Sequence, residues 1–483
     1  MMNAVPPFLG YENADNARGR WNTTGVVLLG TTESANACQA ECVKTLGKDP
    51  TSGCTAYTWY HVGHNLAKSC YGDSTGSWRP FYSDLSQPTK WGNVTSAQNM
   101  PSAYQTPCST RADCSYNGKC VDGKCACYPQ WMGKHCGQLN LIPTSRDAGL
   151  QQHDARGRVS SWGGSVVRGD DGRYHMWAAE MTNDCGIVVW LSNSRIRHAV
   201  STTGPTGPYL PHDISEGLWG HEPTVARAPT GEYALFWTAH FGKENVPCSR
   251  TPCDDCRDGE TTIGRSATCL PDTRCTYRPQ LLSYMAFAPD PAGPWSTPQP
   301  IPSPPGFAGD TNLAPIIRAD GSLLALGRPP WVWRANDWRN ASTYTVEKVG
   351  GSGTVEGEDP FLYVDSRDPS VLHGLSHAGG WDSSGGHVWS IDDGRTWGRH
   401  EDVAAYGSLI TFTDDEKTAH AATPDHLSLS RRERPHLVFD GDGLPVALTN
   451  GATERWPCTH PEHCPRDHCF TALQRLNTGS LED

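Results

Sequence analysis

The sequence predicts a mainly β protein, a five-bladed β-propeller preceded by two small N-terminal disulfide-rich modules. Three observations lead to this prediction. The 483-residue chain contains 50 Gly and 37 Pro, a frequency of turn-forming residues that favours many short strands over helices. Its 19 cysteines cluster in short segments, as in disulfide-built domains. After about residue 140, a strand–turn–strand pattern recurs five times, which is typical of a propeller.

The first predicted module covers residues 17–92 and contains four cysteines. Cys38 and Cys42 are four residues apart, so they lie on one face of a predicted helix. The segment 54–59 alternates in polarity like a strand. This arrangement resembles the PAN/apple fold, in which a short helix is disulfide-bonded to a small sheet. An unrelated disulfide-stabilised mini-domain is the alternative.

The second predicted module covers residues 104–137 and contains six cysteines, namely Cys108, Cys114, Cys120, Cys125, Cys127 and Cys136. So short a segment cannot bury a sizeable core, and cross-links replace the missing burial. The spacing resembles an EGF-like domain. That resemblance implies that the first cysteine pairs with the third, the second with the fourth and the fifth with the sixth. The segment 104–107 lacks the acidic residues that calcium-binding members carry, so we expect no calcium in this module.

The third predicted domain, residues 140–478, carries the propeller. Four of its five strand starts contain a Pro, whose missing N–H is tolerated there. A turn and a second strand follow most of them, as in successive hairpins. The five starts are 162–167, 221–226, 312–317, 358–363 and 432–438. The segment 390–397 resembles the Asp-box of sialidases, a structural turn signature. The whole pattern resembles the five-bladed glycoside hydrolases of family 43 and, more distantly, family 32.

Nine further cysteines lie in the propeller region, so either one thiol is left over or a bridge joins two loops. The run from Cys458 to Cys469 also contains His460, His463 and His468, a spacing that suits a zinc site. Disulfides are the favoured interpretation, because the rest of the chain indicates an oxidising compartment.

Cysteine content and three glycosylation sequons, at Asn22, Asn93 and Asn340, predict a secreted or extracellular-surface protein. No signal peptide is visible in the first ten residues. The net charge of −12, without a block of Lys or Arg, argues against nucleic acid as a partner. No apolar run reaches the roughly 18 residues of a membrane span. We expect a carbohydrate ligand, with extracellular matrix proteins as further partners of the two small modules.

Functional residues of a propeller are expected where the innermost strands begin, because these positions converge on the central axis. The residues just before the shared Pro, or their counterparts, are Gly163, Glu222, Ala314, Asp359 and Arg434. Glycoside hydrolysis needs two carboxylates, so Glu222 and Asp359 are the predicted catalytic pair. The neighbouring carboxylates Asp310 and Glu358 are predicted to tune their pKa values, and Glu433 is a further candidate.

Predicted substrate-binding residues surround this pair. Trp162 offers a stacking face for a sugar ring, and polar side chains offer hydrogen bonds to hydroxyl groups. These polar residues are His221, Asn312, Arg328, His377 and Arg434. We expect no cofactor and no obligatory metal, although a calcium ion on the axis is compatible with the fold.

One position departs from the family that the propeller resembles. The resemblance implies a general base, an Asp at the start of the first blade, where this chain has Gly163. Two functions therefore stay open. The chain is either a secreted glycoside hydrolase acting on a poly- or oligosaccharide, or a non-catalytic extracellular protein that binds glycans or matrix partners. A sialidase is a weaker third alternative, since only one Asp-box is present and the blade starts supply no arginine triad.

Overall fold

The computed structural model describes residues 26–31, 56–60, 69–73, 94–98, 107–150, 159–182, 186–187, 190–217, 220–239, 268–269, 275–276, 281–307, 309–328, 331–349, 357–377, 384–400, 404–413, 426–453 and 469–479. The chain divides into two compact units, residues 1–107 and 108–483. Within the described residues, no helix is long and apolar enough to cross a lipid bilayer.

The first unit contains one antiparallel sheet in the order β1–β3–β2–β4. Its strands are β1 (Val26–Thr31), β2 (Ala56–Tyr60), β3 (Ser69–Asp73) and β4 (Val94–Gln98). Strand β2 overlaps the strand predicted at 54–59. The helix predicted around Cys38 and Cys42 lies outside the described residues, so the PAN/apple assignment of residues 17–92 stays a prediction.

The second unit begins with a small disulfide-rich module. It consists of the 3-10 helix η3 (Ala112–Cys114), the hairpin β5 (Gly118–Val121) and β6 (Lys124–Cys127), and the short pair β7 (Trp131–Met132) and β8 (Gln138–Leu139). Its three disulfides are Cys108–Cys120, Cys114–Cys125 and Cys127–Cys136. This connectivity confirms the pairing that the EGF-like resemblance implied.

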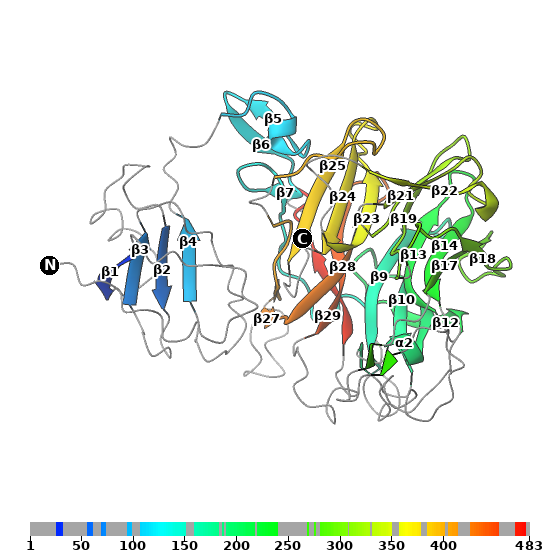
Figure 1. Cartoon of the computed structure of the whole chain (residues 1–483). Coiled ribbons are helices and arrows are strands. Elements are labelled where there is room, and N and C mark those ends of the chain that lie inside the picture. The colour runs from blue at the N-terminus through cyan, green and yellow to red at the C-terminus, as the bar shows by residue number, and fades with distance from the viewer. Residues whose placement is uncertain are drawn as a thin grey trace. The chain divides into compact units, whose positions relative to one another are not determined.

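Five antiparallel sheets follow, and each is one blade (Figure 1). Within the residues that the structure describes, the first three blades have four strands and the last two have three. From the inside outward, the first blade contains β9 (Ser161–Arg168), β10 (Tyr174–Met181), β11 (Ser194–Ser201) and β12 (Leu210–Glu216), and the second contains β13 (His221–Arg227), β14 (Tyr233–Ala239), β17 (Leu282–Ala288) and β18 (Gln299–Ile301). The third blade contains β19 (Ala314–Ile317), β20 (Leu323–Leu326), β21 (Trp331–Ala335) and β22 (Thr345–Lys348). The fourth contains β23 (Glu358–Val364), β24 (Leu372–His377) and β25 (Gly385–Ser390), and the fifth contains β28 (Arg431–Phe439), β29 (Pro445–Thr453) and β30 (Phe470–Arg475).

Smaller elements lie between these blades. They are the helix α2 (Trp190–Asn193), the pair β15 (Thr268–Cys269) and β16 (Cys275–Thr276), the 3-10 helix η5 (Ala341–Thr343), and the pair β26 (Leu409–Thr411) and β27 (His426–Ser428). The predicted cysteine run from Cys458 to Cys464 lies outside the described residues.

The innermost strands close into a ring. Strands β9, β13, β19, β23 and β28 each contact the next in this order, and β28 contacts β9. The chain that enters the propeller reinforces this closure, because Leu141 bridges to Leu476 beyond β30 while Leu150 bridges to Tyr209 next to β12. The predicted five-bladed propeller is therefore confirmed.

The disulfide-rich module packs against the fourth blade. Arg111 forms an ion pair with Asp368 at 2.6 Å in the turn between β23 and β24. The ring of Trp131 lies 4.8 Å from that of His387 on β25, centroid to centroid. Half-buried cysteines of the module also contact the apolar cluster that contains Leu375. Module and propeller thus share one core.

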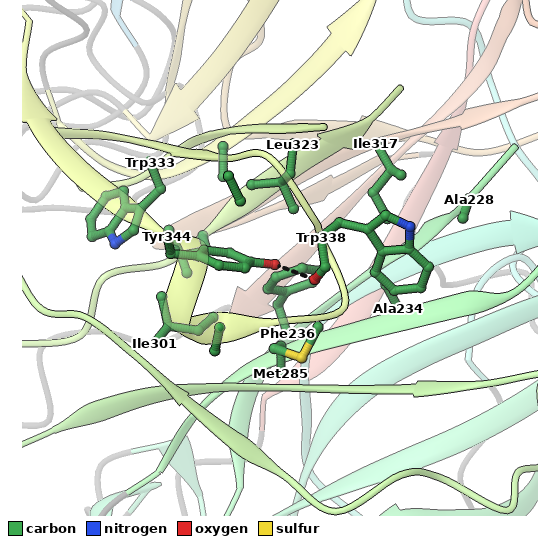
Figure 2. Packing of buried hydrophobic residues seen from close by; sticks show 14 residues of the cluster. Ala228, Ala234, Phe236, Met285, Ile301, Ile317, Leu323, Trp333, Trp338 and Tyr344 are labelled. Atoms are coloured by element: carbon green, nitrogen blue, oxygen red, sulfur yellow. Dashed lines mark hydrogen bonds between the residues drawn. The ribbon is translucent and has the colours of Figure 1, made fainter. Parts of the chain in front are cut away.

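An apolar cluster fills the space between the second and third blades (Figure 2). Phe236 and Met285 come from the second blade, and Trp333 and Trp338 from the third. The hydroxyl of Tyr344 donates a hydrogen bond to the backbone oxygen of Trp338 at 2.7 Å, which fixes the loop that follows β21. The alternating apolar residues of the predicted strands therefore form the contact between neighbouring blades.

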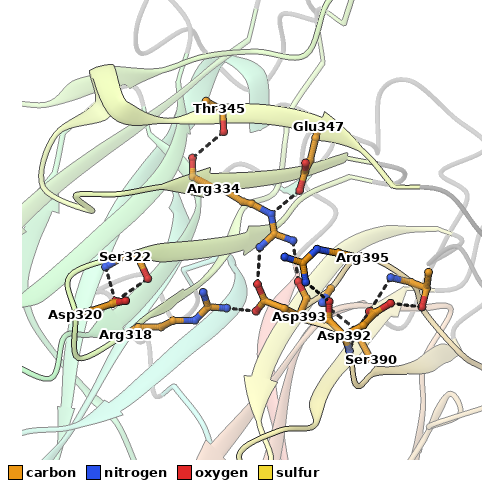
Figure 3. A network of polar contacts seen from close by, with 12 residues as sticks. Arg318, Asp320, Ser322, Arg334, Thr345, Glu347, Ser390, Asp392, Asp393 and Arg395 are labelled. Carbon is orange, nitrogen blue, oxygen red and sulfur yellow. Dashed lines mark hydrogen bonds and ion pairs between the residues drawn. The ribbon is translucent and has the colours of Figure 1, made fainter.

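The predicted Asp-box is a turn that ties the fourth blade to the third (Figure 3). The backbone N–H of Thr396 donates to Asp392 Oδ1 at 2.8 Å, and that of Gly394 donates to Ser390 Oγ at 2.9 Å. The adjacent Asp393 forms ion pairs with Arg318 and Arg334 of the third blade. The predicted structural role of this segment is confirmed.

Replacing Trp338 with Ala tests the contact between the second and third blades. Because Trp338 is only 1% exposed, the change leaves a cavity, and we expect a loss of about 3–5 kcal/mol in unfolding free energy. Chemical denaturation of the full chain measures it. Ile391→Ala is the control, since Ile391 is 59% exposed and its truncation is expected to change stability by less than about 0.5 kcal/mol. Equal stability of both variants would contradict the assigned packing.

Candidate active site

Every blade has a residue in the left-handed backbone region close to the start of its innermost strand. These residues are Gly163 (φ 68°), Glu222 (φ 56°), Asn312 (φ 48°), Asp359 (φ 55°) and Arg434 (φ 50°). In four blades the position coincides with a register shift in the pairing of the innermost strand with its neighbour. Such bulges redirect side chains out of the regular alternation. The five positions are therefore structurally equivalent.

The third blade differs from the prediction. Its equivalent residue is Asn312, and Ala314 is the first residue of β19. The misplacement arose from Pro315, which stands three residues after the left-handed residue. In the second, fourth and fifth blades, Pro223, Pro360 and Pro435 directly follow it. A proline near the strand start was therefore not a reliable marker of the register.

Four of the five equivalent side chains meet on the axis. Arg434 Nη1 donates a hydrogen bond to Asp359 Oδ1 at 3.2 Å and lies 3.5 Å from Glu222 Oε1. Asn312 Nδ2 donates a second hydrogen bond to the same oxygen of Asp359. All four side chains are buried. The predicted pair Glu222 and Asp359 is thus bridged by one guanidinium nitrogen.

The fifth position explains how Arg434 fits. A Cβ atom on Gly163 would lie 3.0 Å from Nε and 3.3 Å from Cδ of Arg434. The glycine therefore leaves room for the arginine side chain beside the first blade. Gly163, which departs from the family pattern, therefore lies against the side chain of Arg434 from the fifth blade.

A second layer of polar side chains lies next to these residues. Arg328 forms ion pairs with Glu358 and, at 3.2 Å, with Asp310. His377 Nε2 lies 3.7 Å from Glu433 Oε1, and His377 Nδ1 lies 4.0 Å from Glu358 Oε1. We call the whole group the axial cluster; its members are Glu222, Asp310, Asn312, Arg328, Glu358, Asp359, His377, Glu433 and Arg434.

The axial cluster is reached from the side of Arg328 and Glu358. Their side chains are 31% and 36% exposed, whereas those of Glu222, Asp310 and Asp359 are 10% exposed or less. A ligand that approaches from this side meets one guanidinium and one carboxylate first, with the buried carboxylates behind them.

Burial and charge give the carboxyl groups of the cluster different proton affinities. The pKa of Glu222 is raised well above 4.5, chiefly by burial and further by the nearby charge of Asp310. Burial also raises the pKa values of Glu358 and Glu433. Glu222 Oε2 has no hydrogen-bond partner among the described residues. Glu222 is therefore the group best placed to hold a proton at neutral pH.

Three members of the cluster are suited to bind a cation. Asp359, His377 and Glu433 each present one ligand atom, and these atoms lie within 4.8 Å of one another. Two carboxylate oxygens and one imidazole nitrogen are acceptable ligands for several divalent cations. The expectation that an axial calcium ion is compatible with the fold stays a prediction.

Two predicted substrate-binding residues lie deeper in the blades. Trp162 is 3% exposed and packs with Ala179 and Met181 of β10. His221 is 2% exposed, its Nδ1 lies 2.6 Å from Ser194 Oγ, and its ring stacks on Trp190. Trp162 directly precedes Gly163, and His221 directly precedes Glu222.

Sequence reasoning missed Arg431. Its Nε donates to Glu433 Oε1 at 2.5 Å, and its guanidinium lies 5.8 Å from the ring centroid of Trp162. Arg431 and Glu433 are two residues apart on β28, so strand alternation places them on one face. This two-residue spacing is the sequence signal that would have placed Arg431 beside Glu433.

Comparison with known proteins gives one family match. Residues 108–136 match the family model of the EGF-like domain, and no curated protein matches the chain.

Several solved structures are similar to the chain at low sequence identity. A family 117 glycoside hydrolase of the marine bacterium Zobellia galactanivorans is 14% identical with a TM-score of 0.45, over 72% of this chain and 92% of that one. The α-L-arabinofuranosidase PaAbf62A of Podospora anserina is 10% identical with a TM-score of 0.42, over 71% and 96%. The GH43 protein BlXynB of Bacillus licheniformis is 14% identical with a TM-score of 0.42, over 69% and 54%. The five-bladed architecture itself rests on the ring of sheets in this chain.

Gly163→Ala tests the space that the first blade leaves for Arg434. The new methyl group meets the arginine side chain at a position with φ 68°, so we expect a loss of about 1–3 kcal/mol in unfolding free energy. Gly172→Ala is the matched control, because Gly172 has φ 78° and, apart from its chain neighbours, no atom of the described residues lies within 4 Å of an added Cβ. Thermal and chemical denaturation measure both. A Gly163→Ala protein as stable as the control would contradict this geometry.

Glu222→Gln tests the raised pKa of Glu222. A carboxyl group whose pKa is higher in the folded state costs stability as the pH rises above its unfolded value near 4.5. We expect the variant to be more stable than the wild type at pH 7, with the difference vanishing below pH 4.5.

Denaturant unfolding across this pH range provides the measurement. The control is Glu347→Gln, since the side chain of Glu347 is 52% exposed and its change is expected to shift stability by less than about 0.5 kcal/mol. A wild type that is more stable than Glu222→Gln throughout the range would contradict the assignment.

Proposed function

We propose that the chain is a secreted carbohydrate-active protein, a glycoside hydrolase that cleaves a poly- or oligosaccharide with two carboxyl groups of the axial cluster. The observation that carries this proposal is Glu222, a buried carboxyl group with a raised pKa and an oxygen without a partner among the described residues, beside Asp359. Glycoside hydrolysis pairs a protonated acid with a second, ionised carboxylate.

In the proposed reaction, Glu222 donates its proton to the glycosidic oxygen as the bond to the anomeric carbon breaks. Asp359 Oδ1 accepts hydrogen bonds from Asn312 and Arg434, which fix the second carboxylate. Asp359 either attacks the anomeric carbon as this bond breaks, after which water activated by Glu222 releases the sugar from Asp359, or takes a proton from water that attacks the anomeric carbon directly. The same Arg434 nitrogen contacts both groups, so the two contacting oxygens are at most about 7 Å apart, within reach of one sugar ring.

Substrate hydroxyl groups have several partners around this pair. Arg328 and Glu358, on the accessible side of the cluster, offer donors and acceptors, and His377 lies next to Glu358. Asp310 holds Arg328 in place and raises the pKa of Glu222. A dense set of charged acceptors and donors suits a ligand covered with hydroxyl groups.

Three features support secretion. The module at 108–136 matches an EGF-like domain and holds three disulfides, a bond type typical of oxidising compartments. The predicted acceptor Asn340 is exposed on the third blade, and its side chain accepts a hydrogen bond from the hydroxyl of Ser342 in the same sequon. In this proposal the EGF-like module and the PAN/apple-like region contact matrix partners.

A second candidate function is glycan binding without hydrolysis. It is favoured by Gly163, which stands where the family resemblance implies a general base, and by Arg434, which occupies the space beside it. The guanidinium between Glu222 and Asp359 suits either function, because it neutralises charge and binds an acidic ligand, and it also positions a pair of catalytic carboxyl groups.

Release of reducing sugar decides between the two candidates. We expect the full chain to release sugar from at least one of arabinan, xylan, galactan, fructan and sulfated algal glycans. Glu222→Gln and Asp359→Asn are each expected to lower the rate at least a hundredfold, because each removes one reacting group. Glu347→Gln, on the outermost strand of the third blade, is expected to keep the wild-type rate.

Binding to immobilised glycan is measured in parallel with the same proteins. Retained binding without release by the wild type would contradict hydrolysis and support the binding function. Full activity in either carboxylate variant would remove that residue from the catalytic pair.

A further inference from the structure

A second cluster of imidazole and carboxylate groups lies on the outer strands of the first blade. His198 comes from β11, and His212 and Asp213 come from β12, the outermost strand. Asp213 Oδ2 lies 3.1 Å from His198 Nδ1 and 2.6 Å from His212 Nδ1. One ligand atom from each of the three residues lies within 4.8 Å of the others. Two imidazoles and a carboxylate in this arrangement form a set of zinc ligands.

The buried end of this cluster continues into the blade. His198 Nε2 lies 2.9 Å from His175 Nδ1, and His175 Nε2 lies 3.3 Å from Asp171. The line of contacts therefore runs from the carboxylate of Asp171 through His175 and His198 to the carboxylate of Asp213. Both histidines are buried, at 2% and 1% exposure.

This line of contacts lacks one hydrogen atom when both imidazoles are neutral. Each of the three contacts needs one hydrogen, on His175 Nε2, between the two rings, and on His198 Nδ1. Two neutral imidazoles supply only two hydrogens. Both rings are buried, so an imidazolium at either position would be held away from water.

We propose that His198, His212 and Asp213 bind a zinc ion on the outer edge of the first blade. With the metal on His198 Nδ1, this atom needs no hydrogen, His198 Nε2–H donates to His175, and His175 Nε2–H donates to Asp171. Every contact is then satisfied by two neutral rings. A ligand histidine whose second nitrogen donates towards a buried chain of this kind is the usual support of a protein metal site.

The site is both rigid and accessible. The ring of Trp177 stacks on that of His198, with centroids 4.7 Å apart, and Trp177 Nε1 donates to Ser215 Oγ at 3.0 Å. His212 and Asp213 are 51% and 32% exposed, so an ion reaches them from solvent. The neighbouring guanidinium of Arg173 is neutralised by Asp171, at 2.6 Å. A tetrahedral ion bound by these three residues keeps one position open for water.

The fourth blade provides an internal comparison. His373 Nδ1 lies 3.1 Å from His387 Nε2, which repeats the histidine contact of the first blade. There, the neighbour is Asn117 of the EGF-like module, whose Nδ2 lies 3.4 Å from the same His387 nitrogen. His387 Nε2 corresponds to His198 Nε2, so Asn117 joins the contact between the two histidines and does not occupy the position of His212 and Asp213. The histidine pair thus recurs, and in the first blade it is joined by His212 and Asp213.

Zinc titration of the metal-stripped full chain tests the proposal. We expect His212→Ala to bind one zinc equivalent fewer than the wild type, or to bind it at least tenfold more weakly, and Asp213→Asn to behave likewise. Both side chains are partly exposed, so the variants are expected to fold. His426→Ala, an exposed histidine on β27, is the control and is expected to match the wild type.

The other possible ion position is distinguished by Asp359→Asn, which removes a ligand from the axial group. Unchanged zinc binding in His212→Ala together with loss in Asp359→Asn would overturn the proposal and place the ion on the axis. A wild type that binds no zinc would overturn it as well. Affinity that falls as the pH drops below 6, in the wild type but not in His212→Ala, would support it, since histidine ligands must be neutral.

Discussion

The axial cluster depends on a backbone irregularity that recurs where the innermost strand of each blade begins. A left-handed residue at this point interrupts strand alternation and directs one side chain per blade towards its counterparts. Four such side chains, from Glu222, Asn312, Asp359 and Arg434, then share hydrogen bonds or close charge contacts. A non-glycine residue in this conformation costs free energy, which the surrounding sheets offset. The chemistry of the site is therefore built into the scaffold.

Charge balance within the cluster decides what it can do. Five carboxyl groups and two guanidinium groups are packed into a largely buried space, and their mutual repulsion is relieved in two ways. Arg434 and Arg328 neutralise part of the charge, and Glu222 is favoured in its protonated form. Protonation of one carboxyl beside an ionised neighbour is the arrangement that acid-assisted bond cleavage requires. Gly163 contributes to the same arrangement, because a Cβ atom at its position would lie 3.0 Å from Arg434 Nε and the arginine side chain would have to shift.

Much of the fold was predictable from local patterns, whereas the site depended on register. Turn residues and alternating apolar runs marked the hairpins, and cysteine spacing marked the EGF-like module, because these signals arise from short-range chemistry. The axial positions of Glu222, Asp359 and Arg434 were visible through the proline that follows each of them. The prediction placed the third-blade position at Ala314 instead of Asn312, because Pro315 stands three residues after Asn312 and not directly after it. The contact of Arg434 with Gly163 joins the fifth blade to the first, and no local pattern reports ring closure.

The proposed reaction depends on Glu222, because burial and the charge of Asp310 raise the pKa of its carboxyl group well above 4.5. Infrared difference spectroscopy of the wild type against Glu222→Gln reports the protonation state of this group directly, because a protonated carboxyl group and a carboxylate absorb at different frequencies. We expect a protonated carboxyl band at pH 7 that is lost in Glu222→Gln and retained in Glu347→Gln. A carboxylate band from Glu222 at pH 7 would contradict the proposed role of Glu222 as the acid.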